Sequence, residues 1–233
     1  TKDYVLFPIM PLTGSLERAM SGLPAYAWEP EKGSFIGVMP RAGKVEDIRW
    51  FQGDPAYVFH PMNSFNDGEV ITCDVSEYKV APLFPHADGS PTDAKDTSAK
   101  LKRWTFDLSG NTDDYQSEQL DDIACEFGRL DERYACHAYR HGYMLCEGEE
   151  VVKGTQFSAI AAVDHETGKR ERYDFGPSMS TSEAIFVHRN EDSPEGEGYL
   201  MANVYDANTD KSQLAILDAQ NVTAGPIARA FLD

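Results

Sequence analysis

Short apolar and alternating runs follow one another along the chain, separated by clusters of glycine, asparagine, aspartate and proline. Runs of this length are typical of β-strands, and the clusters between them of turns. Long helical periodicity is nearly absent; one short helix is expected at Leu16 to Met20 and a surface loop over 85–99. The pattern predicts an all-β fold. The expected strands are 34–39, 55–60, 69–74, 101–107, 134–139, 142–146, 156–163, 169–175, 184–188, 198–205 and 212–217.

Three segments of the chain read as hairpins, at 28–50, 162–175 and 199–217. Successive hairpins of similar size suit a β-propeller, whose blades are four-stranded meanders around a channel. A β-sandwich uses the same kind of strand, and periodicity alone does not choose between the two. We expect residues 1–233 to form a single all-β region.

The charge balance narrows the classes of partner. The chain has 39 acidic and 21 basic residues and a net charge of -18, which argues against nucleic acid and against an anionic membrane surface. No apolar run approaches the roughly 18 residues of a membrane-spanning helix, so no stable membrane insertion is expected. The four cysteines form no CxxC pair, which argues against a zinc ribbon and favours a reduced, cytoplasmic protein.

Three ionisable residues stand where the pattern predicts apolar side chains. His60 follows the run YVF, Glu126 lies between IAC and Phe127, and Glu183 precedes AIFV. A buried carboxylate needs a partner, and one arrangement that supplies it is a metal-bound histidine whose outward N–H donates to the carboxylate. The plainer reading is that each glutamate ends a strand and points to water, and that His60 is a structural histidine. The residues alone leave both open.

Other chemistry-bearing patterns are weak or absent. His137 and His141 have the i,i+4 spacing of helical metal ligands, but their context, YACHAYRHGYML, reads as two strands, so the pair is interpreted as a coincidence. The sequence contains no GxSxG, HExxH, P-loop or GxGxxG motif. From its residues alone, the chain is predicted to be an acidic all-β protein with one candidate metal-binding histidine.

Three motifs in order along the chain carry a family resemblance. WEPEKGSFIGVMPR with IRWF and YVFHPMNSFNDG, then CEFGRLDERY, then SEAIFVHR resemble segments of the carotenoid cleavage oxygenases, and most of all the bacterial lignostilbene (stilbene-cleaving) dioxygenases. The resemblance covers essentially the whole chain. It implies part of a seven-bladed β-propeller with Fe(II) on its axis, held by four histidines.

The resemblance assigns roles to individual residues. His60 takes the place of the third iron-binding histidine, and Glu126 and Glu183 take those of carboxylates that accept a hydrogen bond from iron-binding imidazoles. His188 replaces a family proline and is read as structural or exposed. By the same mapping, the other three iron histidines and the remaining blades lie outside this chain, which resembles a C-terminal half. The 233 residues alone are therefore expected to be inactive.

The implied reaction is the oxidative cleavage of a C=C bond by dioxygen in a hydroxystilbene or lignin-derived phenylpropanoid, giving two aldehydes. Phe59 and Phe84 are candidate substrate-binding residues, with core packing as the alternative for each. An apocarotenoid-cleaving oxygenase and a non-catalytic propeller binding module are the competing hypotheses. A homodimer is left open.

Overall fold

The computed structural model describes residues 1–150 and 157–232 and divides the chain into two compact units, 1–122 and 123–233. Both units consist of β-strands with short connections, and the single α-helix among the described residues is α1 (Leu16–Met20). The all-β fold and the helix expected from the sequence are thus confirmed. No helix within the described ranges is long and apolar enough to cross a membrane.

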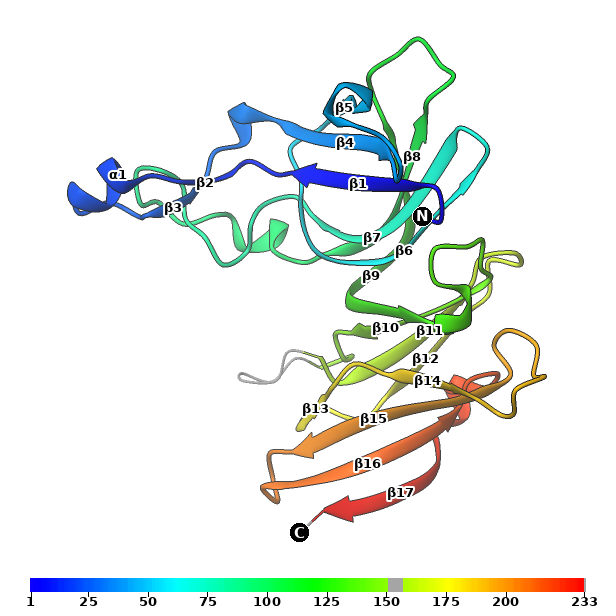
Figure 1. Cartoon of the computed structure of the whole chain (residues 1–233). Helices are drawn as coiled ribbons and strands as arrows, with labels where there is room; N and C mark the ends of the chain where they lie inside the picture. The colour runs from blue at the N-terminus through cyan, green and yellow to red at the C-terminus, as the bar shows by residue number, and fades with distance from the viewer. Residues whose placement is uncertain (151–156, 233) are drawn as a thin grey trace. The chain divides into compact units, whose positions relative to one another are not determined.

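The first unit contains the three-stranded antiparallel sheet β1-β4-β5, the small pair β2-β3, and the antiparallel strands β6-β7-β8, which belong to a seven-stranded sheet in which β8 neighbours β9. Figure 1 shows α1 at the far end of the β2-β3 pair. The elements in chain order are β1 (Tyr4–Ile9), β2 (Leu12–Gly14), α1, β3 (Tyr26–Trp28), η1 (Pro30–Lys32), β4 (Ser34–Pro40), η2 (Val45–Asp47), β5 (Arg49–Gly53), β6 (Tyr57–Asp67), β7 (Val70–Tyr78), η3 (Ala94–Asp96), β8 (Lys100–Asp107) and β9 (Gln116–Leu130), which continues into the second unit.

One arginine fastens α1 to the β2-β3 pair. Ser15 caps the helix by accepting the backbone N–H of Arg18. The guanidinium of Arg18 donates to a carboxylate oxygen of Glu29 at 2.8 Å and to the carbonyl of Thr13 at 2.7 Å. The Thr13 hydroxyl also donates to Glu29. A helix of five residues has little stability of its own, so these contacts hold the segment in place.

The core of the first unit lies between the sheet β1-β4-β5 and the strands β6-β7-β8. Side chains of β4 and β5 meet those of β7 and β8, and the rings of Phe51 and Phe106 pack edge to face with centroids 5.4 Å apart. Alternation along each strand supplies this apolar face. The buried members are Ile36, Val38, Phe51, Ile71, Cys73, Val75, Trp104, Phe106 and Tyr115.

The second unit is built from one meander and one further sheet. Strand β9 pairs with β10, β10 with β11 and β11 with β12, all antiparallel. In the other sheet β15 pairs with β13, β14 and β16, and β16 pairs with β17. The elements are η4 (Glu132–Tyr134), β10 (His141–Cys146), β11 (Ala159–Asp164), β12 (Arg170–Asp174), β13 (Met179–Thr181), β14 (Ile185–His188), β15 (Gly198–Asp206), β16 (Lys211–Asp218), η5 (Val222–Ala224) and β17 (Pro226–Leu232).

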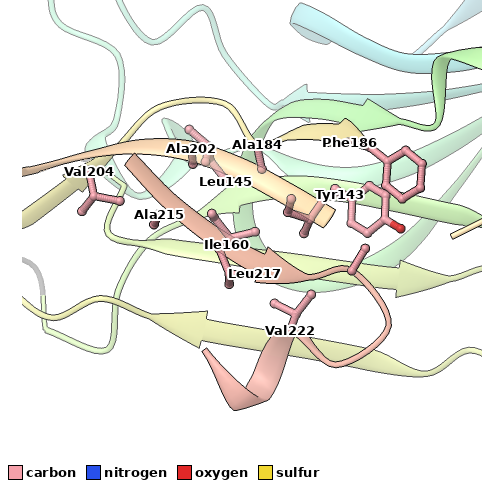
Figure 2. Packing of buried hydrophobic residues seen from close by; sticks show 12 residues of the cluster. Tyr143, Leu145, Ile160, Ala184, Phe186, Ala202, Val204, Ala215, Leu217 and Val222 are labelled. Atoms are coloured by element: carbon pink, nitrogen blue, oxygen red, sulfur yellow. The ribbon is translucent and has the colours of Figure 1, made fainter. Parts of the chain in front are cut away.

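Small and branched side chains from both sheets form the core of the second unit (Figure 2). Leu145 and Ile160 of the meander pack with Leu200 and Leu217 of the other sheet, each at most 2% exposed. At the rim of this core the ring of Tyr143 stacks on Phe186, with centroids 5.6 Å apart and planes 8° from parallel.

Most expected strands are present, with shifted ends. The hairpins expected at 162–175 and 199–217 are β11-β12 and β15-β16. The strand expected over 134–139 is wrong: this segment begins at the last residue of the 3-10 turn η4 and contains no strand. Ala159 is the first residue of the strand expected over 156–163, and residue 156 lies outside the described residues. The longest strand, β9, was not expected.

Candidate functional site

His60 lies at a β-bulge in β6. Val58 pairs with Glu77 of β7 and Pro61 with Val75, so the two residues Phe59 and His60 stand opposite the single residue 76. A second shift follows before Asn63. Bulges bend a strand and re-aim its side chains, and they are over-represented beside active sites. The imidazole is half-buried.

The sequence itself interrupts the ladder here. Pro61 has no backbone N–H and cannot donate a ladder hydrogen bond. Prolines in sheets are therefore confined to edges and bulges. Pro61 marks the bulge, and the histidine immediately before it is released from the regular alternation of the strand.

Aromatic rings pack around the first residue of this bulge. The ring of Phe59 lies edge to face against Tyr57 and Tyr78, with centroids 4.8 and 5.6 Å away. Its centroid is 6.2 Å from that of the His60 imidazole. Burial raises the pKa of the Tyr57 phenol, so this hydroxyl stays protonated at neutral pH. The bulge is therefore embedded in an aromatic, weakly polar surrounding.

A largely apolar cavity of about 540 Å³ adjoins the same segment of β6. Its walls include Tyr57, Val58, Phe59 and Pro61, together with side chains of β1, β7 and β8. Cavities of this size and character suit drug-sized organic ligands. Phe59 thus lines this cavity, whereas His60 is not among its lining residues, and a role of Phe59 in substrate binding remains a prediction.

Glu126 is buried in the second unit, with 2% of its surface exposed. It follows the buried Cys125 on β9 and pairs with Leu145 of β10. Its Oε2 accepts the backbone N–H of Phe127 at 2.8 Å. The expectation that this carboxylate is buried among apolar residues is confirmed, and the reading in which it points to water is wrong.

A second bulge follows Glu126 directly. Glu126 pairs with Leu145 and Arg129 with Tyr143, so two residues of β9, at positions 127 and 128, oppose the single residue Met144 of β10. The backbone of Phe127 is left-handed, with φ of +54°. The histidine and the buried glutamate singled out from the sequence thus both lie at, or next to, a bulge.

Glu183 lies in the connection between β13 and β14, and 44% of its side chain is exposed. Its carboxylate faces the guanidinium of Arg129 at 3.4 Å. Arg129 also pairs with Glu132 at 2.7 Å. Sequence reasoning missed Arg129, which connects the Glu183 segment to the strand that carries Glu126. For Glu183 the reading of a solvent-facing strand end describes its exposure better than that of a buried acid.

The other candidate residues are dispersed. Phe84 lies in a turn, half-buried, with its ring edge-on to Tyr26 at 6.4 Å, and it does not line the cavity next to Phe59. His137 is exposed in the turn after η4, His141 begins β10, and His188 ends β14. The interpretation of the 137/141 spacing as a coincidence fits these positions.

The donor set in this chain matches part of an iron site. Across residues 1–150 and 157–232, no three His, Cys, Asp or Glu side chains come together as a metal site would require. One half-buried imidazole at a bulge and one buried carboxylate suit a histidine ligand and the partner of another. A complete four-histidine set is not found among the residues that the structure describes.

Comparison with known proteins extends over the whole chain. The family model described as Retinal pigment epithelial membrane protein matches residues 1–233. An isoeugenol monooxygenase from Pseudomonas putida is 36% identical over 240 residues, covering 100% of this chain and 50% of the relative. A lignostilbene-alpha,beta-dioxygenase isozyme III from Sphingomonas paucimobilis is 36% identical over 247 residues, with the same coverage. The chain thus spans about half the length of these relatives.

Comparison with solved structures finds the same family as the sequence comparison. The crystal structure of lignostilbene dioxygenase from Pseudomonas brassicacearum matches 100% of this chain and 51% of its own, with a TM-score of 0.92 and 32% identity. Cobalt-substituted apocarotenoid oxygenase from Synechocystis matches with a TM-score of 0.86 and 28% identity, over 49% of its chain. The fold is therefore that of part of a β-propeller. The chain belongs to the Retinal pigment epithelial membrane protein family, the carotenoid cleavage oxygenases.

Proposed function

We propose that this chain is part of a non-haem Fe(II) dioxygenase that cleaves the C=C bond of a hydroxystilbene or a lignin-derived phenylpropanoid into two aldehydes. The observation that carries the proposal is the placement of His60 and Glu126 at bulges of two strands, at the positions where the family resemblance puts an iron ligand and a hydrogen-bond partner of a ligand. The names of the lignostilbene and isoeugenol relatives support the substrate class. The seven-bladed propeller remains a prediction.

In this proposal His60 offers a neutral ring nitrogen to the metal. Glu126 and Glu183 accept N–H groups of ligating imidazoles and so fix the tautomer and orientation of those rings. Iron, when bound, supplies the activation of dioxygen. The burial of Glu126 strengthens its hydrogen bonds, because the low dielectric of the interior reduces screening. Glu183 is more exposed and is expected to contribute less.

The substrate alkene is proposed to bind among apolar and aromatic side chains. Phe59, which lines the cavity of about 540 Å³, is the stronger of the two proposed contacts. Phe84 is retained as a weaker proposal. We further propose a cytoplasmic protein, a requirement for segments beyond these 233 residues to complete the ligand set, and no activity for this chain alone.

An apocarotenoid-cleaving oxygenase is the second candidate, favoured by the likeness to the Synechocystis enzyme. The intact polypeptide is here the longer protein of which this chain is proposed to be a part. Assays of the intact polypeptide with a 4-hydroxystilbene and with an apocarotenal distinguish the two candidate functions. Cleavage of the stilbene is expected, and cleavage of the apocarotenal alone would overturn the preferred substrate class.

Substituting the proposed ligand tests the metal role. In the intact polypeptide His60→Ala is expected to lose bound iron and to lower cleavage activity by at least about 100-fold, the upper range for a partner of a ligand. His137→Ala is the matched control, because His137 is exposed, and it is expected to keep both. Full iron content and activity in His60→Ala would favour the non-catalytic binding module or a different site.

A further inference from the structure

The backbone at Phe127 is unusual for its position. Within the described part of the chain, the non-glycine residues with positive φ are Phe127, Cys136 and Asp210. Cys136 and Asp210 lie in turns, where such a backbone is common, whereas Phe127 lies inside the 15-residue strand β9. Left-handed backbone is unfavourable for any residue with a Cβ. The first position of a bulge of this kind is ordinarily a glycine.

Packing of the ring holds this backbone in place. Phe127 is half-buried against the core of the second unit, and its ring meets Phe157 edge to face, with centroids 6.1 Å apart and planes at 90°. An unfavourable backbone persists only where surrounding contacts over-determine it, and such positions cluster at functional sites. The packed ring of Phe127, called the apolar anchor below, is therefore the contact that opposes relaxation of this bulge.

The left-handed backbone at Phe127 also affects the side chain of the preceding residue, Glu126. In a regular antiparallel strand the N–H of residue 127 would lie in the plane of the sheet, toward a neighbouring strand. In this bulge it donates instead to Oε2 of Glu126 at 2.8 Å. A hydrogen bond from a fixed backbone amide restrains the orientation of a buried carboxylate, so the direction in which Glu126 presents its oxygens depends on residue 127.

We propose that Phe127 is a positioning residue: its anchored ring holds a left-handed bulge whose amide orients the Glu126 carboxylate for hydrogen bonding to an iron-binding imidazole. This inference rests on the proposed iron site. It adds the structural feature, the bulge at Phe127, that orients the Glu126 carboxylate. Neither the residue nor the bulge was expected from the sequence.

Two variants that differ by one methyl group test it. Phe127→Ala removes the anchor but keeps the Cβ, so the backbone is expected to relax and the carboxylate to lose its orientation. Phe127→Gly also removes the anchor, but glycine adopts the left-handed backbone without a steric penalty, so the bulge and its amide contact are expected to be retained. Loss of ring burial alone would affect both variants alike.

The readouts are made on the intact polypeptide loaded with iron. The rate of iron loss to a chelator is expected to rise about 10-fold in Phe127→Ala and by less than about 3-fold in Phe127→Gly, since partners of metal ligands typically change affinity 10- to 100-fold. The electron paramagnetic resonance spectrum of the Fe(II)–nitric oxide complex is expected to change in the alanine variant only. Equal behaviour of the two, or a worse glycine variant, overturns the proposal.

A coupled variant identifies the route of the effect. In a Glu126→Ala background the difference between alanine and glycine at position 127 is expected to vanish, because no side-chain oxygen remains at position 126 for the residue-127 amide to orient. A difference that persists there overturns the proposal. If Phe127→Ala does not fold, Phe127→Leu replaces it: leucine keeps an apolar anchor, so iron retention close to the parent is expected, and loss as large as that of Glu126→Ala overturns the proposal.

Failure of the underlying function gives a different result. If His60→Ala keeps its iron, the proposed iron site is wrong whatever the variants at position 127 do. If His60→Ala loses iron while the alanine and glycine variants at 127 behave alike, the site stands and only the positioning role is wrong.

Discussion

At the scale of single residues, the second unit contains a buried hydroxyl without a partner. Tyr143 is 1% exposed, and its Oη has no hydrogen-bond partner among the described residues. Burial, with the nearby carboxylates of Glu195, Asp131 and Asp218, raises the pKa of this phenol, so it is neutral at any physiological pH. The stacking of its ring on Phe186 (Figure 2) therefore stabilises the unit while the hydroxyl opposes burial.

Tyr143→Phe is expected to increase the free energy of unfolding by about 1 kcal/mol, because it removes an unsatisfied buried polar group and keeps the ring. Urea denaturation should show a higher midpoint with an unchanged slope. Tyr205→Phe is the control: this hydroxyl is bonded to Asp210 at the surface, and a change below about 0.5 kcal/mol is expected. Destabilisation by Tyr143→Phe would contradict the conclusion that the Tyr143 hydroxyl is buried without a hydrogen-bond partner.

At the scale of elements, the acid dependence of the α1 segment follows from one carboxylate. Hydrogen bonds from Thr13 and then from Arg18 lower the pKa of Glu29 below its ordinary value of 4.5. A carboxylate whose pKa is lowered by folding stabilises the fold fully above its unfolded pKa, and this contribution disappears as the pH falls through the folded pKa. The attachment of α1 to the β2-β3 pair should therefore weaken in acid.

The predicted weakening in acid can be measured by hydrogen exchange with mass spectrometry, with the rates corrected for the pH dependence of intrinsic exchange. Protection of residues 12–28 is expected to fall between about pH 5 and pH 3 in the parent protein. Glu29→Gln is expected to show low protection throughout with no such step. Glu31→Gln, an exposed neighbour, should behave like the parent. A step that survives in Glu29→Gln would assign the effect to another group.

The strands also differ in how well they could be predicted from the sequence. Strands with alternating apolar residues, such as β15 and β16, were predicted within a residue or two, because their burial pattern repeats every second position. Strand β9 escaped prediction because its first half, QSEQLDD, is polar and mostly exposed. The segment 134–139 was mispredicted, because its aromatic residues pack without forming a ladder.

The candidate site was predictable in part for the same reasons. His60 and Glu126 were visible as ionisable residues in apolar runs, and Pro61 signals a break in β6. Nothing in the local pattern distinguishes Glu183, which is exposed at 44% of its side chain, from a solvated acid. The bulge at Phe127 was not predicted. An isolated glycine inside a strand is a sequence sign of a bulge, and Gly128 stands in this one, but the left-handed backbone lies one position earlier, at Phe127.

At the scale of the whole chain, the question is what these 233 residues can hold. They offer one candidate imidazole at a bulge and no cluster of three metal-binding side chains among the described residues. Two of the three proposed site residues are in the second unit and one is in the first. The relatives are about twice as long. A single histidine competes poorly with water and buffer for Fe(II).

Metal analysis of the purified 233-residue polypeptide after dialysis against a chelator is therefore expected to find far less than one iron per chain. His60→Ala in the same polypeptide should make no difference, because the parent retains little iron to lose. Stoichiometric iron that withstands dialysis and disappears in His60→Ala would contradict this prediction and would mean that the chain completes the site by itself.

The double interruption of β6 also bears on how the length of this segment can change in evolution. Five steps along the strand, from Val58 to Asn63, oppose three steps along β7, from Glu77 to Asp74. The surplus is two residues, one for each interruption, and the pairs on either side of each interruption still share a face of the sheet. Loss of one surplus residue can therefore be absorbed without inverting the strand. Loss of both would leave a regular ladder without the bulge that contains His60.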